Sequence, residues 1–213
     1  MGTDTARAEG AARLRAEGLA CRRGDRLLFE GLAFDLGQGE SLHVRGDNGV
    51  GKTSLLRLLA GVAHPEAGRV LWNDEDIARC RDDFHEALLY IGHQPGIKDD
   101  LTALENLRLA SSLDGHALSE ADALDALDRL GLRGREDLPV RHMSQGQRRR
   151  VALSRLTWRK ARIWILDEPL TALDAAAIEL VTGLLRAHVD EGGLAVLTSH
   201  QTVPMAGIRE LHL

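Results

Sequence analysis

Residues 46–54 combine residue types that handle phosphate groups. Their sequence, GDNGVGKTS, fits the GxxxxGK[ST] pattern of a phosphate-binding loop, the Walker A motif. Glycines let such a loop turn its backbone N–H groups inward, while Lys52 can reach the terminal phosphates and Thr53 can ligate magnesium. The stretch is predicted to bind a nucleotide through Gly46, Asp47, Asn48, Gly49, Val50, Gly51, Lys52, Thr53 and Ser54.

A second stretch, RIWILDEP, carries two adjacent carboxylates. The apolar run from Ile163 to Leu166 predicts a buried parallel strand, which delivers Asp167 and Glu168 at its carboxyl end, where ligands collect in such sheets. Asp167 is predicted to hold magnesium directly or through water, and Glu168 to orient and deprotonate an attacking water. An acidic pair after a strand is equally typical of a helix cap or turn. Beside a Walker A motif it indicates Walker B.

The elements that position these residues follow from periodicity. Residues 31–49 alternate apolar and polar positions between glycines, which is typical of antiparallel strands and their turns. Ser41 to Arg45 predicts a strand running directly into the Walker A loop, and residues 54–61 then have helical spacing up to Gly61. The Walker A loop is therefore predicted to join a strand to a helix.

The segment between 95 and 145 is predicted to be mainly helical. Thr102 with Glu105 fits a capping box at the start of one helix, and Ser119 followed by Asp122 begins a second in a similar way. After the acidic pair, LAVLTS at residues 194–199 predicts another short buried strand.

Composition excludes several classes of protein. The chain has 213 residues, 44% of them hydrophobic and 28% charged, which is enough to bury a core and excludes general disorder. The net charge of −5 does not favour a nucleic-acid partner. Cys21 and Cys80 form no CxxC pair and are predicted to be free thiols. No apolar run reaches the length of a membrane span or signal peptide, so we expect a cytoplasmic chain.

Four further motifs, in order along the chain, make the sequence resemble the ATP-binding subunits of ABC transporters from about Leu19 onward. They are a glutamine loop at Gln94 in YIGHQPG, a signature sequence MSQGQ at residues 143–147, a D-loop aspartate at Asp174 in LTALD, and a switch histidine at His200 in TSHQ. The resemblance implies an α/β P-loop NTPase core with an N-terminal antiparallel β subdomain and an inserted helical subdomain at about 95–145, within a nucleotide-binding domain at 19–213. Residues 1–18 are expected to form a tail.

The resemblance also implies roles for individual residues. Gln94 is expected to touch magnesium and the attacking water, and His200 to hydrogen-bond the γ-phosphate. In the family, the signature residues bind an ATP that is held by a second copy of the chain. In this sequence the resemblance assigns that role to Ser144, Gly146 and Gln147. Gln145 replaces the usual first glycine of the signature, and the following residues 148–150, all arginine, are expected to serve packing and surface solubility.

The adenine contact departs from the family pattern. The stretch CRRGDRLLF lacks the aromatic residue that often stacks on adenine. Arg23, or Arg22, is offered in its place, because a guanidinium can stack on a base. A solvated turn arginine remains the alternative.

The stretches around the glutamine loop, signature helix and Walker B resemble the ATP-binding subunits of haem exporters for cytochrome c maturation. This resemblance implies ATP and Mg²⁺ as ligands, a homodimer, membrane-embedded permease partners of a haem-export complex, no nucleic acid, and a peripheral place on the cytoplasmic face of a bacterial inner membrane. No cysteine or histidine pattern indicates haem binding by the chain itself.

Three alternatives stay open. The chain could energise another exporter, such as a lipoprotein or peptide carrier, which shares the catalytic motifs. A soluble ABC ATPase acting on ribosomes or DNA usually has a second cassette or a long coiled-coil insertion, and neither fits in 213 residues. A P-loop kinase for a small metabolite has no use for the signature or the switch histidine.

Overall fold

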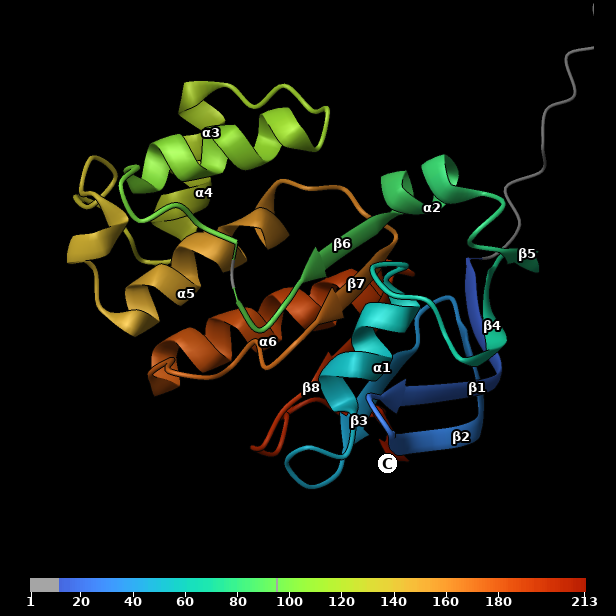
Figure 1. Ribbon diagram of the computed structural model, residues 1–213. Helices are drawn as coiled ribbons and strands as arrows, with labels where there is room; N and C mark the ends of the chain where they lie inside the picture. The colour runs from blue at the N-terminus through green and yellow to red at the C-terminus, as the bar shows by residue number, and fades with distance from the viewer. Residues whose placement is uncertain (1–11, 95) are drawn as a thin grey trace, which may run out of the picture.

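The computed structural model describes residues 12–94 and 96–213, and two sheets organise it (Figure 1). Among these residues one sheet has the strand order β6-β7-β8-β3-β9, with every neighbouring pair parallel. The other has the order β2-β1-β4-β5 and is antiparallel. The strands are β1 (Arg13–Arg23), β2 (Arg26–Gly37), β3 (Ser41–Arg45), β4 (Ala67–Trp72), β5 (Glu75–Asp76), β6 (Leu88–Ile91), β7 (Ile163–Leu166), β8 (Leu194–Thr198) and β9 (Arg209–His212).

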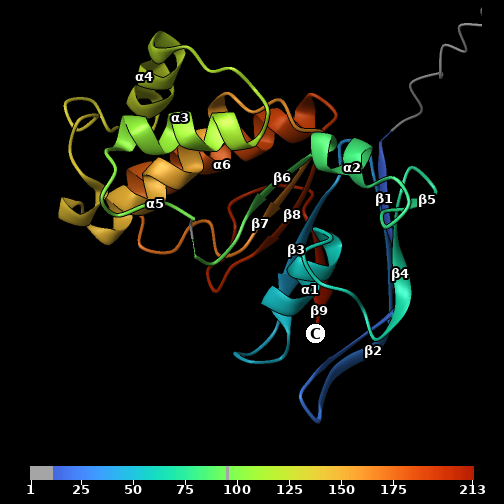
Figure 2. The ribbon, with the colours of Figure 1, turned by 45° about the horizontal axis from the view of Figure 1, so that its top comes forward.

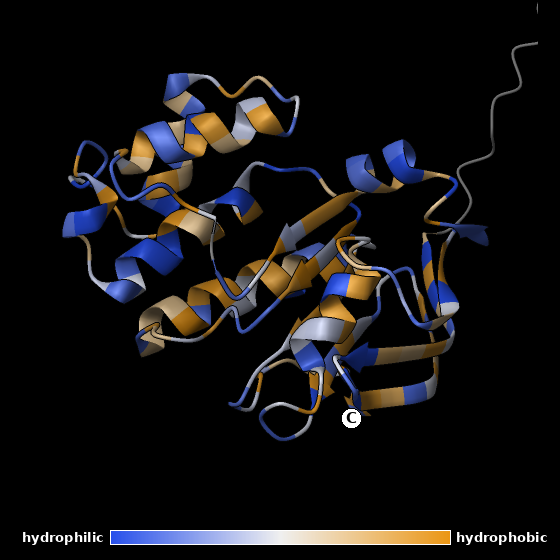
Figure 3. Cartoon of the chain, viewed as in Figure 1, coloured by the Kyte–Doolittle hydropathy of each residue, from blue (hydrophilic) through white to orange (hydrophobic). Residues whose placement is uncertain are grey.

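Helices cover both faces of the parallel sheet (Figures 1 and 2). They are α1 (Lys52–Leu59), α2 (Arg81–Ala87), α3 (Ala103–Leu113), α4 (Glu120–Arg129), α5 (Gln145–Leu153) and α6 (Ala175–Asp190), with 3₁₀ turns η1 (Val140–His142) and η2 (Ser154–Thr157). Side chains of β7 alternate between the faces: Ile163 and Ile165 join the core with α1 and the antiparallel sheet, whereas Trp164 and Leu166 join the core with α5 and α6. Burial on both faces explains the continuous apolar run of this strand, and apolar residues dominate β7 and its neighbours in Figure 3.

A separate core lies under the helices that follow β6. Leu107 of α3, Leu127 of α4 and Val151 of α5 are buried together, and Val140 of η1 completes the cluster. The sequence predicted both helix starts correctly. Thr102 accepts from the N–H of Glu105 in a complete capping box, and Ser119 accepts from the N–H of Asp122.

The N-terminal boundary differs from the prediction. Strand β1 begins at Arg13, so residues 13–18 belong to the antiparallel sheet and not to the expected tail, while residues 1–11 of that tail lie outside the described residues. Leu14 and Ala16 point into the main core and are at most 1% exposed. The register shifts between Ala16 and Leu19, which breaks the alternation that marks a strand in the sequence.

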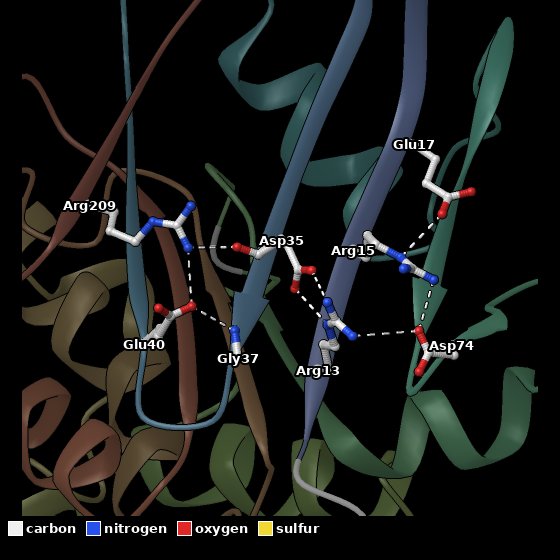
Figure 4. Close-up of polar contacts among 8 residues, drawn as sticks. All are labelled: Arg13, Arg15, Glu17, Asp35, Gly37, Glu40, Asp74 and Arg209. Atoms are coloured by element: carbon white, nitrogen blue, oxygen red, sulfur yellow. Dashed lines mark hydrogen bonds and ion pairs between the residues drawn. The ribbon is translucent and has the colours of Figure 1, made fainter.

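Charged side chains form a ladder across β2 and β1 that ends at Asp74 in the turn after β4 (Figure 4). The Arg13 guanidinium binds the Asp35 carboxylate and lowers the pKa of that carboxyl group. Arg15 reaches Asp74 at 2.8 Å, on the far side of β1. At the other end, Arg209 of β9 donates to the Asp35 carbonyl oxygen at 2.6 Å, so the ladder connects the antiparallel sheet to the parallel one.

Cys21 and Cys80 are free thiols, as predicted. Within residues 12–94 and 96–213, no helix combines the length and the hydropathy needed to cross a membrane.

Candidate active site

The Walker A loop joins β3 to α1, as predicted. Gly46, Gly49 and Gly51 all have positive φ angles, of 141°, 81° and 118°, which side-chain-bearing residues rarely adopt. Space is also restricted: a Cβ on Gly46 would lie 2.9 Å from the Leu213 carbonyl oxygen. Gly51 is the N-cap of α1 and offers no side-chain cap. The first N–H groups of the helix are therefore available to an anion such as phosphate.

Lys52 is folded back over this loop. Its side chain is buried, and Nζ donates to the carbonyl oxygens of Gly46 at 2.7 Å and Asp47 at 3.1 Å. A bound phosphate competes with these two oxygens for the ammonium group.

Both Walker B carboxylates are buried at the carboxyl end of β7, and Thr198 of β8 binds the Asp167 carboxylate and the Glu168 backbone. The Thr198 hydroxyl donates to Asp167 Oδ1 at 2.8 Å and accepts from the N–H of Glu168 at 2.8 Å. Asp167 Oδ2 and Glu168 Oε1 are buried without a hydrogen-bond partner. Unpaired carboxylate oxygens fit a hydrated Mg²⁺ and an attacking water, both of which need oxygen acceptors.

Glu168 is held in an unusual backbone conformation. Its φ of 52° lies in the left-handed region, which costs a residue with a side chain about 1–3 kcal/mol. The carboxylate accepts from the Thr171 hydroxyl and the His200 N–H, both at 3.3 Å, and His200 Nε2 lies 3.5 Å from Oε1. The local backbone thus aims this carboxylate toward the switch histidine.

A cavity of about 300 Å³, here called the nucleotide cavity, gathers most of the predicted residues. Arg23 of β1 borders it, as the proposed adenine contact requires, together with Leu28 of β2. His93 lines it although the sequence did not single this residue out. The other lining residues are Asn48, Gly49, Gly51, Lys52, Thr53, Ser54, Asp167, Glu168 and His200.

Gln94 does not line the nucleotide cavity. It is exposed and borders a neighbouring cavity of about 550 Å³, here called the loop cavity, with Gln145, Arg149 and Thr171. Glu168 and His93 line both cavities. The predicted contacts of Gln94 with magnesium and water require it to line the nucleotide cavity, but it lines the neighbouring loop cavity.

The signature residues lie farther away. Ser144 is the N-cap of α5 in a complete capping box with Gln147. Gly146 packs against the turn before α6, where a Cβ on this glycine would lie 2.6 Å from the Ala172 carbonyl oxygen. These residues and Asp174 line a third cavity, the signature cavity, of about 600 Å³, which shares no lining residue with the nucleotide cavity.

Arg149 is packed inside the protein, which is one of the two roles expected for residues 148–150. Its side chain is 6% exposed and donates to the carbonyl oxygens of Asp167 at 2.6 Å and Gly92 at 3.2 Å. Burial lowers the pKa of this guanidinium, and the charges of Asp167 and Glu168 oppose that shift. The arginine fastens the end of β6 to the end of β7, so it serves the site's structure and not surface solubility.

Comparisons with known proteins agree with this geometry. Residues 29–171 match the ABC transporter family. The chain is 50% identical over 200 residues to the cytochrome c biogenesis ATP-binding export protein CcmA of Nitrosomonas europaea, covering 94% of each. It is 52% identical over 202 residues to the same-named protein of Dechloromonas aromatica, covering 94% of this chain and 99% of the relative.

Solved structures share the fold at low identity. A putative ABC transporter ATP-binding protein from Pyrococcus furiosus superposes with a TM-score of 0.81 at 21% identity, covering 94% of this chain and 97% of the other. An ATP-binding cassette described as a dimeric post-hydrolysis state bound to ADP and Pi has a TM-score of 0.76 at 22% identity, covering 88% of each chain.

Proposed function

The chain belongs to the ABC transporter family, among its cytochrome c biogenesis ATP-binding export proteins, and from this premise we propose that it hydrolyses ATP to energise a membrane-embedded haem exporter. One observation carries the catalytic part of this proposal. A single cavity is lined by Lys52, His200 and the two Walker B residues, each of which has one carboxylate oxygen without a hydrogen-bond partner among the described residues. These groups are the ones needed to bind a triphosphate and to activate a water molecule that attacks its terminal phosphate.

The proposed reaction needs only positioning and charge stabilisation by these residues. Lys52 leaves the loop carbonyls and binds the terminal phosphates, while Glu168 accepts a proton from the water that attacks the γ-phosphate. His200 donates a hydrogen bond to that phosphate. Thr53 and Asp167, with Gln94 after its loop closes, would hold Mg²⁺, which when bound neutralises charge on the phosphates.

A second copy of the chain completes the proposed site. Among the described residues, none lines both the signature cavity and the nucleotide cavity of the same chain, which supports a role of Ser144, Gly146 and Gln147 at an ATP bound to another copy. Their helix start, with Ser144 as N-cap, suits an anion. Two chains arranged head to tail would each cover the other's ATP, and this homodimer is the arrangement we propose.

Two variants test the ATPase activity. Glu168→Gln should bind ATP with wild-type affinity and hydrolyse it at least about 100-fold more slowly, because an amide cannot accept the proton of the attacking water. Lys52→Ala should lose both binding and hydrolysis, because no cation remains for the terminal phosphates. Binding is measured with a fluorescent ATP analogue and turnover by phosphate release. Wild-type turnover in Glu168→Gln would contradict the proposed mechanism.

The permease is proposed to dock at a groove between α1, α2 and α3. Val62 and Leu113 are 54% and 78% exposed, and they border the same cavity of about 600 Å³. Two exposed apolar side chains beside a lining that also contains Asp82, Glu86 and Arg159 favour an amphipathic protein segment as occupant. We propose a cytoplasmic segment of the membrane subunit. Leu113→Asp should then release the chain from washed membranes, whereas Leu124→Asp, a control on α4 that is 37% exposed in the wild type, should not.

By this proposal the chain sits peripherally on the cytoplasmic face of a bacterial inner membrane. The alternative, an exporter of lipoproteins or peptides, leaves every catalytic assignment unchanged and differs in the membrane partner. Gentle solubilisation of membranes that contain the tagged chain, followed by mass spectrometry of captured proteins, separates the two. Capture of haem-handling cytochrome c maturation subunits supports the haem exporter, and capture of another permease in their place refutes it.

A further inference from the structure

His93 lies level with the Walker B glutamate at the carboxyl edge of the parallel sheet. Strands β6 and β7 pair in parallel with Ile91 opposite Leu166. His93 stands two positions beyond Ile91, as Glu168 stands two positions beyond Leu166. On the other side of β7, strand β8 leads to His200. Glu168 is thus flanked by histidines that follow its two neighbouring strands.

His93 lies where the nucleotide cavity meets the loop cavity. Of the residues that the structure describes, His93 and Glu168 are the two that line both the nucleotide cavity and the loop cavity. Gln94, the next residue, lines only the loop cavity. At this position of the loop, therefore, His93 and not Gln94 borders the cavity that Lys52 and Glu168 line.

The backbone that carries His93 is anchored. The buried Arg149 guanidinium donates to the carbonyl oxygen of Gly92 at 3.2 Å and to that of Asp167 at 2.6 Å. One side chain therefore links the residue before His93 to the residue before Glu168. An anchored backbone holds a side chain near a fixed point, which a catalytic group requires.

We propose that His93 is a further catalytic residue of ATP hydrolysis, in direct contact with the γ-phosphate on the side of Glu168 that faces β6. This proposal rests on the proposed ATPase function. An imidazole N–H of His93 donates a hydrogen bond to a γ-phosphate oxygen. The bond from the water oxygen to phosphorus forms as the bond to ADP breaks, and the water proton passes to Glu168. His93 transfers no proton and stabilises the charge on the phosphate oxygens.

Two substitutions of His93 test the hydrogen bond. His93→Leu keeps much of the volume without a donor, and His93→Gln keeps an N–H donor. We expect His93→Leu to lower kcat by about 10- to 100-fold, since removing one such donor costs about 100- to 1,000-fold in a fully formed oxyanion site and His200 remains. His93→Gln should recover at least a third of the wild-type rate. His64→Leu is the matched control, because His64 is exposed and lines none of the three cavities of the site.

The measurements use the full chain purified with the permease that co-purifies in mild detergent, with Mg-ATP as substrate. ATP affinity is measured in a Glu168→Gln background, where we expect His93→Leu to change it by less than about threefold. A kcat for His93→Leu within twofold of the wild type refutes the proposal. Equal losses in His93→Leu and His93→Gln also refute it, because they indicate a role in shape alone.

Failure of this inference is distinguishable from failure of the proposed function. If wild-type chain hydrolyses ATP and Glu168→Gln does not, the ATPase assignment stands whatever His93 does. If Lys52→Ala or Glu168→Gln turns over ATP like the wild type, the proposed function itself is wrong.

Discussion

Replacing Thr198 by valine removes the hydroxyl that binds the Asp167 carboxylate and the Glu168 backbone, while it keeps the shape of the side chain. The side chain is fully buried, and its hydroxyl makes two hydrogen bonds of 2.8 Å, to Asp167 Oδ1 and from the N–H of Glu168. A bond to a charged group contributes about 1.5–3 kcal/mol, and a buried N–H left without an acceptor costs about 1–3 kcal/mol. We therefore expect Thr198→Val to lower the free energy of unfolding by about 3–5 kcal/mol.

Urea denaturation followed by tryptophan fluorescence measures this change. Thr198→Ser keeps the hydroxyl and should lose only about 1 kcal/mol, from one buried methyl group. Thr182→Val is the matched control: this buried threonine donates only to the Ile178 carbonyl oxygen of its own helix, so we expect a change of at most about 1 kcal/mol. The reasoning is refuted if Thr198→Val and Thr182→Val lose equal stability.

Three further outcomes are expected. Gly146→Ala places a Cβ 2.6 Å from the Ala172 carbonyl oxygen and should lower ATP hydrolysis at least about tenfold with ATP affinity unchanged, in phosphate-release and binding assays. Arg149→Met leaves the Asp167 carbonyl oxygen without its donor and should cost about 2–4 kcal/mol of unfolding free energy in urea. Burial lowers the pKa of His43. Below about pH 6.5 this histidine therefore binds a proton in the unfolded chain but not in the folded one. The free energy of unfolding should then decrease by up to about 1.4 kcal/mol for each unit by which the pH is lowered. His43→Gln should flatten that slope in denaturation curves recorded from pH 7.5 to 5.5.

The residues that could be predicted from the sequence are those whose type is tied to local backbone geometry. Gly51 and Lys52 belong to a motif that is specific to phosphate-binding loops. The apolar run before Asp167 predicts strand β7 and the position of its carboxyl end. The capping box at Thr102 follows from spacing alone. Each of these signals lies within a few consecutive residues, so no knowledge of tertiary contacts is required.

The missed residues act through contacts between distant strands. Thr198 lies in a β-strand, where threonine is common, and only the pairing of β7 with β8 brings its hydroxyl to Asp167. Arg149 stands between two other arginines, and its burial depends on how α5 packs. His93 and Gln94 are neighbours in a loop, so the sequence does not reveal which of them borders the nucleotide cavity.

The charged ladder of Figure 4 and the nucleotide cavity lie at opposite ends of β1. Arg23 and Leu28 reach that cavity from β1 and β2, the strands that the ladder crosses, and Arg209 connects the same ladder to β9. Exposed ion pairs contribute at most about 1 kcal/mol each and are screened over about 8 Å at physiological ionic strength. Such pairs add little to folding, and Arg13 of the ladder stands about 30 Å along β1 from Arg23, well beyond that screening distance. Ionic strength therefore acts on the junction between the two sheets, while hydrogen bonds inside the core hold the Walker B end of the nucleotide cavity.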